Sequence, residues 1–311
     1  MLKAYSYIES DKLDSGIVDR DVFAKEKQLI TEFAFLNPSP KVEAPCILCG
    51  HETKGFDMID NVYYQRCCGC YSIFAKVDDD IIESYKRYQP LLDFRNTDKY
   101  QVSAAIRREI IWNDLLFWLE FRLARYISKK SGVSVIDHGN RYTALADRIK
   151  KSKFCSSYNS VKKADVVLFF DQFRCLSNPS EALFQLREML VDNGLLIMNM
   201  RVGSGFDVLA IKGSKDNFYP YEVICLPSIE GLDIVLSETG FDILEISTPG
   251  TLDIEHVMQN KEYLDEDDLF VHYLLNKADG SMLAEFQRFL QKSGMSSHAR
   301  VIARKRSVQN G

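Results

Sequence analysis

The second half of the chain alternates short apolar runs with segments that are apolar at every third or fourth position. The apolar runs have the length of β-strands and lie at 133–137, 153–158, 165–170, 195–200, 241–247 and 299–304. The helical periodicity lies at 143–151, 179–194 and 228–240. Strands that alternate with amphipathic helices are typical of a parallel sheet covered by helices on both faces, so we predict an α/β fold here.

The rest of the chain has weaker patterns. Residues 21–33 are periodic like a helix, and a proline-containing linker follows them. Two short segments, 62–67 and 71–77, alternate like the strands of a hairpin. From 103 to 130 apolar residues recur every three or four positions, which predicts one long helix. Residues 254–294 are predicted to be helical additions.

The composition is that of an ordinary globular protein, with 46% hydrophobic and 27% charged residues and a net charge of -5. This mildly acidic balance argues against a broad surface for nucleic acid or anionic lipid. No apolar run reaches the ~18–20 residues of a membrane helix. Acidic residues near the N-terminus interrupt the place where a secretory signal would be apolar. We therefore predict a cytoplasmic protein with reduced cysteines, no nucleic acid partner and no membrane insertion.

Five of the eight cysteines lie between positions 46 and 70. Four of these five form two pairs with two intervening residues each, the spacing of a zinc ribbon. The predicted ligands of this structural zinc ion are Cys46, Cys49, Cys67 and Cys70. Cys68 or His51 could replace one of them. With four protein ligands no position stays open for water, so the metal is expected to fold the segment and to take no part in catalysis.

Polar residues at the carboxyl ends of parallel strands are the first candidates for ligand binding in an open α/β sheet. Asp137 and Gly139 follow the first strand of the second half, and Asp171 and Gln172 follow the strand at 165–170. An acid can hold hydroxyl or amino groups of a nucleotide-type cofactor, and glycine lets the backbone approach it. We predict these four residues as cofactor-binding. Asp137 could equally cap the helix that follows it.

Several segments in the same order resemble one family. The chain resembles the class I S-adenosylmethionine-dependent methyltransferases that have an N-terminal zinc ribbon and are often associated with sugar and surface-polysaccharide biosynthesis. The similar segments are the cysteine module and residues 164–199, 203–213, 226–253 and 289–305. The resemblance implies a Rossmann-like methyltransferase sheet, S-adenosylmethionine as cofactor, and a sugar, nucleotide-sugar or related small molecule as substrate.

The departures from this family lie where the cofactor and the chemistry should be. The family's D-x-G-x-G-x-G loop corresponds here to Asp137, Gly139, Arg141 and Thr143, so two of the three glycines are replaced. The residues 174–175 are Arg-Cys where the family has Glu-His. Val223 stands where the family has a histidine. These changes put binding of S-adenosylmethionine in doubt.

The sheet is also predicted to be short. Only 28 residues separate Asp137 from Asp165, and each parallel crossover needs at least ~10–12 residues. One crossover fits, so we expect a strand–helix unit to be missing from the half of the sheet that would hold adenosine. Tyr158 and Asn159 stand where an acid would bind the ribose.

Candidates for proton transfer are few. Tyr221 and Glu222 could supply hydrogen bonds or a base to a sugar hydroxyl or amine, since removing a proton from a nucleophile needs a positioned acceptor. His256 could be an alternative base if the helical addition folds over the cleft, although a solvated helix histidine is the simpler interpretation. His298, before the last strand, fits packing or anion contact as well as catalysis.

Two functional hypotheses follow. The chain could be a methyltransferase that acts on a sugar or related small molecule in surface-polysaccharide or secondary metabolism. Alternatively, it could be a catalytically inactive relative, a binding or scaffold subunit with a protein partner from the same pathway. The predicted regions are a helical extension (1–44), a zinc ribbon (45–78), a helical linker (79–132) and a Rossmann-like domain (133–311) with the helical addition at 254–294.

Overall fold

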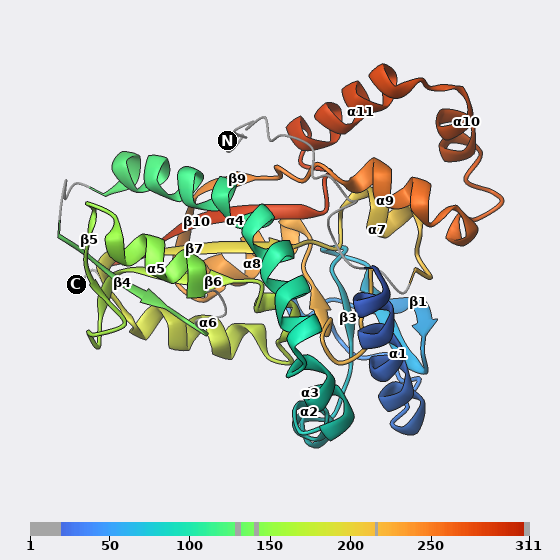
Figure 1. The fold of residues 1–311 in the computed structure, drawn as a ribbon, viewed down its shortest axis with the longest axis horizontal. Helices are drawn as coiled ribbons and strands as arrows, with labels where there is room; N and C mark the ends of the chain where they lie inside the picture. Colours follow the sequence, from blue (N-terminus) through green and yellow to red (C-terminus); the bar gives the residue numbers. More distant parts are fainter. Residues whose placement is uncertain (1–19, 128–131, 140–142, 215–216, 308–311) are drawn as a thin grey trace.

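The main body of the protein is a six-stranded sheet with helices on both faces (Figure 1). A computed structural model describes residues 20–127, 132–139, 143–214 and 217–307. The strands of this sheet are β4 (Val133–Asp137), β5 (Cys155–Tyr158), β6 (Ala164–Phe170), β7 (Leu190–Arg201), β9 (Phe241–Ser247) and β10 (His298–Lys305). The longer helices are α1 (Arg20–Leu36), α2 (Asp79–Lys86), α4 (Asp98–Tyr126), α5 (Thr143–Lys151), α6 (Pro179–Glu188), α8 (Ile229–Glu238), α10 (Leu269–Lys277) and α11 (Gly280–Lys292). The short ones are α3 (Gln89–Arg95), α7 (Phe206–Ala210) and α9 (Asp253–Gln259), with 3-10 turns η2 (Phe173–Cys175) and η3 (Lys261–Tyr263).

The strand order β5-β4-β6-β7-β10-β9 confirms the predicted Rossmann-like α/β fold and its missing unit. Strands β5, β4, β6 and β7 are parallel, and β10 runs antiparallel between β7 and β9. One helix, α5, joins β4 to β5, whereas residues 159–163 lead from β5 into β6 without a helix. Strand β5 therefore ends the sheet on the side where the length argument expected a strand–helix unit to be missing.

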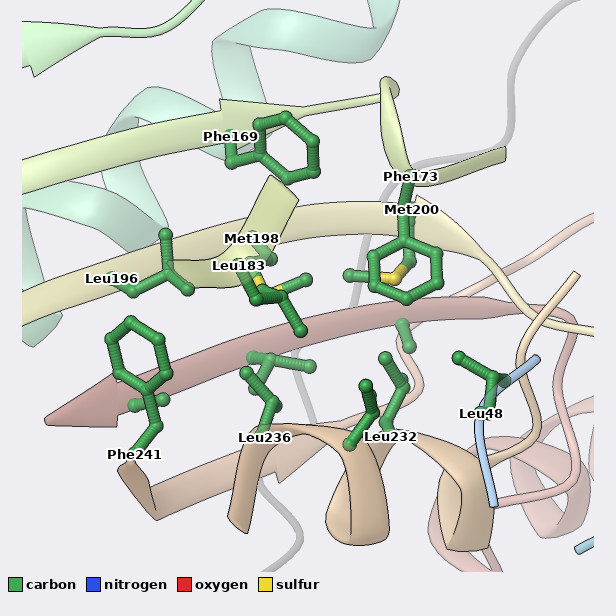
Figure 2. Packing of buried hydrophobic residues seen from close by; sticks show 14 of the residues in the cluster. Leu48, Phe169, Phe173, Leu183, Leu196, Met198, Met200, Leu232, Leu236 and Phe241 are labelled. Carbon is green, nitrogen blue, oxygen red and sulfur yellow. The ribbon is translucent and has the colours of Figure 1, made fainter. Parts of the chain in front are cut away.

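Each face of the sheet has its own apolar core. On one face α4 and α5 bury Trp118 and Leu145 against strand residues such as Phe170. On the other face α6 and α8 bury Leu183 and Leu236 against β6, β7 and β10 (Figure 2). The large buried side chains interlock in the space between α8 and the strands, and this packing fixes the carboxyl ends of the strands relative to each other.

A second sheet, in the order β1-β2-β3-β8, joins the two halves of the chain. Its strands are β1 (Thr53–Ile59), β2 (Val62–Cys67), β3 (Ile73–Ala75) and β8 (Cys225–Leu226). The predicted β2–β3 hairpin is confirmed. Strand β1 was not predicted, and β8 comes from the second half of the chain and pairs with β3. The division into four regions stays a prediction, because the cysteine segment and the second half share this sheet.

The long helix predicted at 103–130 is present but begins at Asp98 and ends at Tyr126. Thr97 caps its start, since its hydroxyl accepts the N–H of Tyr100 at 3.3 Å. Helices α2 and α3, in the segment before it, were not predicted. The predicted helical addition is present as α9, α10 and α11, which lie beyond one end of the sheet (Figure 1). Among the described residues no helix combines the length and apolar character that crossing a membrane requires.

Candidate functional site

The cysteines predicted as metal ligands converge on one point. All of their Sγ atoms lie within 4.8 Å of one another, and the residues are Cys46, Cys49, Cys67 and Cys70. Backbone N–H groups point at the sulfurs, from Leu48 to Cys46 at 3.5 Å and from Gly69 to Cys67 at 3.3 Å. Such donors favour the thiolate form, which is the form that binds metal. The residues present therefore fit a closed, tetrahedral metal site.

The two alternative ligands lie outside this group. Cys68 is exposed, and its N–H donates to the carbonyl of Glu52 at 2.9 Å. His51 packs over Gly69, where a Cβ atom would come within 2.8 Å of the His51 ring. Its Nδ1 lies 3.2 Å from the carbonyl oxygen of Cys49. The glycine after Cys68 thus leaves room for the imidazole beside the turn.

The cysteine cluster is fastened to the α/β sheet. The N–H of Ser228, at the start of α8, donates to Ser72 Oγ at 2.9 Å, and the Ser228 hydroxyl donates to the carbonyl of Cys70. Gly231 completes the contact, because a Cβ atom there would lie 2.2 Å from Ser72 Oγ. Both serines are fully buried. The cysteine cluster therefore lies at the junction of the two sheets.

Asp137, predicted to bind a cofactor, already has partners within the chain. It is 5% exposed at the end of β4, and its Oδ2 accepts the hydroxyl of Tyr158 at 2.6 Å. Its N–H donates to Asn159 Oδ1 at 2.7 Å. Burial and the hydrogen bond to Asp137 raise the pKa of Tyr158, so the phenol stays protonated and keeps donating. The residues at the end of β5 thus bind the acid at the end of β4.

Gly139 and Gln172 contact each other. Gly139 has a φ of 91°, and a Cβ atom on it would lie 2.3 Å from Gln172 Nε2. The Gln172 amide donates to the carbonyl of His138. The open side of the glycine therefore holds a side-chain amide of the same chain. Residues 140–142, which include Arg141 of the predicted loop, lie outside the described residues.

These described strand ends do not fit S-adenosylmethionine. One carboxylate oxygen of Asp137 is bonded to Tyr158, the space over Gly139 is filled by Gln172, and no acid follows β5. A pocket of about 350 Å³ remains at these strand ends, with Asp137 and Gly139 among its walls, at the low end of the range for small-molecule sites. Its lining residues are Ile136, Asp137, His138, Gly139, Asn159, Val161, Lys162 and Met189.

A second polar group lies at the carboxyl end of β7. Arg201, the last residue of β7, and His256 on α9 both contact Asp207 Oδ2, at 2.5 Å from Nη2 and 2.7 Å from Nδ1. Asp207 is 2% exposed. Burial opposes its ionisation, but Arg201 and His256 outweigh this and lower the pKa of Asp207 to about 2. Because the carboxylate is ionised, it accepts the Nδ1–H of His256, and this bond fixes the orientation of the imidazole ring.

Two further residues extend this group. His298, the first residue of β10, pairs with Arg201 in the β7–β10 register. Its Nε2 lies 2.7 Å from Asn199 Oδ1, and the backbone carbonyl of Asn199 accepts the N–H of Asp171 at 2.8 Å. Asp171, predicted to bind a cofactor, is thus connected to β7. We use the name strand-end cluster for Asn199, Arg201, Asp207, His256 and His298.

The sequence singled out both histidines of the strand-end cluster but missed its other members. Asn199 and Arg201 end an apolar strand, the same signal that selected Asp137 and Asp171. Asp207 lies in the first turn of α7, a helix too short to show periodicity. Its pairing with His256, 49 positions later, depends on how α9 returns to the sheet.

Tyr221 lies among aromatic side chains near α1. It has a φ of 65°, its ring packs edge-on against Phe33 at 5.3 Å, and its hydroxyl donates to the carbonyl of Asn37. These contacts tie the second half of the chain to α1. A catalytic role for Tyr221 stays a prediction.

Glu222 is part of a partly buried ion-pair group. It pairs with Arg95 of α3 and lies 3.8 Å from Arg174, and its Oε1 accepts the hydroxyl of Tyr85 at 3.0 Å. Burial opposes its ionisation, but the two arginines outweigh this and lower the pKa of Glu222. A carboxylate with a lowered pKa is a weak base. A catalytic role for Glu222 also stays a prediction.

No family model matches the chain, and no curated protein matches it. Several solved structures are similar. The cyclase SpnF is 16% identical, with 67% of this chain and 82% of that chain covered and a TM-score of 0.34. Phosphoethanolamine N-methyltransferase 2 of Haemonchus contortus, solved with S-adenosylhomocysteine, is 16% identical over 69% of this chain and 60% of that chain, with a TM-score of 0.40. YcgJ of Bacillus subtilis is 12% identical over 61% and 98%, with a TM-score of 0.35. At these identities the similarity concerns the fold alone.

Proposed function

We propose that this chain is a class I methyltransferase-family protein whose S-adenosylmethionine pocket is closed by its own side chains, and that it acts as a binding or scaffold subunit. The observation that supports this most directly is the Tyr158–Asp137 hydrogen bond, which uses the acid expected to hold the cofactor. The Gln172 side chain also blocks the pocket, because it fills the space beside Gly139. The missing strand–helix unit removes a further wall of the pocket.

The closure has an energetic cost for any ligand. A hydrogen bond to a charged group contributes about 1.5–3 kcal/mol, so displacing Tyr158 from Asp137 would weaken cofactor binding roughly 10- to 100-fold unless the ligand restored the bond. Gln172 would have to leave its bond to the His138 carbonyl as well. Both groups belong to the folded chain, so every ligand molecule that binds has to displace them at this fixed cost.

Calorimetric titration with S-adenosylmethionine and S-adenosylhomocysteine tests this proposal. We expect no heat with the wild-type protein at millimolar ligand. Saturable micromolar binding would refute it. Tyr158→Phe combined with Gln172→Ala shows whether these two groups alone block the site. Tyr126→Phe is the matched control, because Tyr126 also donates to a carboxylate, that of Glu245 at 2.9 Å, but does so between α4 and β9.

The strand-end cluster favours a second candidate, a methyltransferase that acts on a sugar, nucleotide-sugar or related small molecule. A histidine whose Nδ1 is held by a carboxylate can accept a proton at Nε2. His256 is held in this way by Asp207 at the carboxyl end of β7. Transfer of a labelled methyl group from S-adenosylmethionine to a panel of sugars and nucleotide-sugars is the test. Transfer by the wild type that His256→Ala abolishes would favour this candidate, and no transfer to any acceptor would exclude it for that panel.

We also propose that the cysteine cluster holds one zinc ion with a structural role. Two pairs of thiolates that converge with N–H groups directed at sulfur are suited to Zn²⁺. Elemental analysis of the purified protein is expected to give about one zinc per chain. Cys49→Ser should lose it, whereas Cys68→Ser, a change at the neighbouring exposed cysteine, should retain it.

A further inference from the structure

Strand β5 presents an open edge. Within the described residues it pairs only with β4, and it stands at the end of the six-stranded sheet. The connection 159–163 runs directly into β6, so the crossover that would have added a neighbouring strand and a helix is missing on this side. An edge of this kind offers main-chain groups to another extended chain.

The surroundings of this edge are basic, although the whole chain has a net charge of -5. Between residues 147 and 163 there is one acidic residue, Asp147, and there are six exposed basic residues: Arg148, Lys150, Lys151, Lys153, Lys162 and Lys163. The ammonium group of Lys150 lies 5.2 Å from the ring centre of Tyr158, which places it beside β5. A concentration of positive charge on an acidic protein favours a negatively charged partner.

A partly apolar pocket adjoins the same edge. The pocket of about 350 Å³ has the apolar residues Ile136, Val161 and Met189 among its walls, together with the polar residues Asp137, His138, Asn159 and Lys162. Val161 is 37% exposed and lies in the connection that follows β5. Alternate side chains of an added strand point to opposite faces of the sheet. One apolar side chain of such a strand could therefore enter the pocket while its neighbours face the basic residues.

We propose that an acidic, extended segment of a partner protein binds here, adds a strand to β5 and inserts an apolar side chain into the pocket. We call this surface, made of β5, the six basic residues and the pocket, the β5 edge. The inference rests on the proposed role as a binding subunit and names the kind of partner. A second copy of this chain is a poor partner, because pairing two β5 edges would bring basic residues against basic residues.

Fluorescence anisotropy with the full-length protein tests the charge and its location. The probe is a labelled ten-residue peptide that alternates Glu with Val and has one central Leu. We expect Lys151→Glu, Lys153→Glu, Lys162→Glu and Lys163→Glu, made together, to weaken binding at least about tenfold at low salt. The matched control carries the same change at exposed lysines elsewhere: Lys54, Lys76, Lys261 and Lys277. It has the same net charge and should bind within about twofold of the wild type.

Strand addition and the pocket need their own probes. An added strand pairs with the edge through the N–H groups of alternate residues, so two peptides are compared, N-methylated at one or at the other alternate set. The peptide methylated at the pairing residues should lose binding, and the other should retain it. Replacing the central Leu of the peptide by Ala should weaken its binding to the wild-type protein. The same replacement should change binding to the Val161→Asn protein little, because the apolar wall of the pocket is already altered there. Equal binding of the two N-methylated peptides, or equal binding to the charge-reversed and control proteins, would refute the proposal. An oligothymidylate that binds more tightly than the peptide would assign the basic surface to nucleic acid and would refute it too.

This test is separate from that of the closed pocket. If the peptide fails to bind and S-adenosylmethionine also gives no heat, the proposal of a partner site at the β5 edge is refuted and the proposal of a closed cofactor pocket is retained. If both S-adenosylmethionine and the peptide bind, the proposal of a closed cofactor pocket is refuted and the proposal of a partner site at the β5 edge is retained.

Discussion

Asp207→Asn should destabilise the protein in a way that depends on pH. The pKa of Asp207 is lowered to about 2, against roughly 3.9 for an unfolded aspartate. A difference of about two units corresponds to ~2.5 kcal/mol of stability. Because the folded-state pKa is the lower one, this stability is fully present above about pH 5 and is lost as the pH falls towards 2.

Urea unfolding of wild type and variant at a series of pH values measures the effect. At pH 6 we expect the variant to be less stable by about 2–3 kcal/mol, and at pH 3 the difference should be roughly half as large. Asp253→Asn is the matched control. Asp253 is also buried, but burial and the charge of Asp207 raise its pKa. Its contribution therefore has the opposite sign, and the stability of the wild type relative to this variant should rise as the pH falls.

A difference between wild type and Asp207→Asn that stays constant from pH 6 to pH 3 would refute this reasoning. It would mean that the Asp207 carboxylate gains nothing from Arg201 and His256, and that any loss of stability comes from the shape of the asparagine. The proposed orientation of the His256 ring would then lose its physical basis, because that orientation depends on an ionised Asp207.

Three further predictions concern stability. Chelation of zinc, or Cys49→Ser, should lower the melting temperature and broaden the thermal transition in scanning calorimetry; an unchanged melting temperature would argue against a structural metal. Leu232→Ala, in the core beneath α8, should cost about 2–5 kcal/mol in chemical unfolding, and a loss below 1 kcal/mol would contradict the packing. Arg122→Leu should cost about 3–5 kcal/mol because Glu245, 2.8 Å away, is left buried without its charge partner, and adding Glu245→Leu should recover most of that loss.

The sequence predicted the elements whose patterns are local. Strands β4 and β9 have the predicted bounds, because each is a short, largely apolar segment that begins or ends at a turn. Strand β8 could not be predicted in this way. It is two residues long and exists because β3 of the cysteine segment lies beside it. Helices α2 and α3 are too short for a helical period to stand out from the surrounding polar residues.

The candidate site was predictable to a smaller degree. The spacing of the four cysteines was enough to predict that they lie together, since each pair belongs to one local turn. The strand-end residues Asp137 and Asp171 were selected correctly as lying at carboxyl ends of strands. Their partners were beyond prediction, because Tyr158 reaches Asp137 only when β5 pairs with β4 in the observed register. Glu222 was proposed as a base from its residue type, and its two arginine neighbours come from distant parts of the chain.

The contact between Ser72 and Ser228 spans 156 positions, and this separation has a consequence for synthesis on the ribosome. The cysteine segment leaves the ribosome long before the residues that cover it. At 5–20 residues per second the interval is roughly 8–30 s. During that time β3 lacks its β8 neighbour and the four thiols are exposed to oxidation. An ion captured early would protect the thiols and hold the hairpin until α8 arrives, so the zinc supply of the cell during translation should affect the yield of the whole protein.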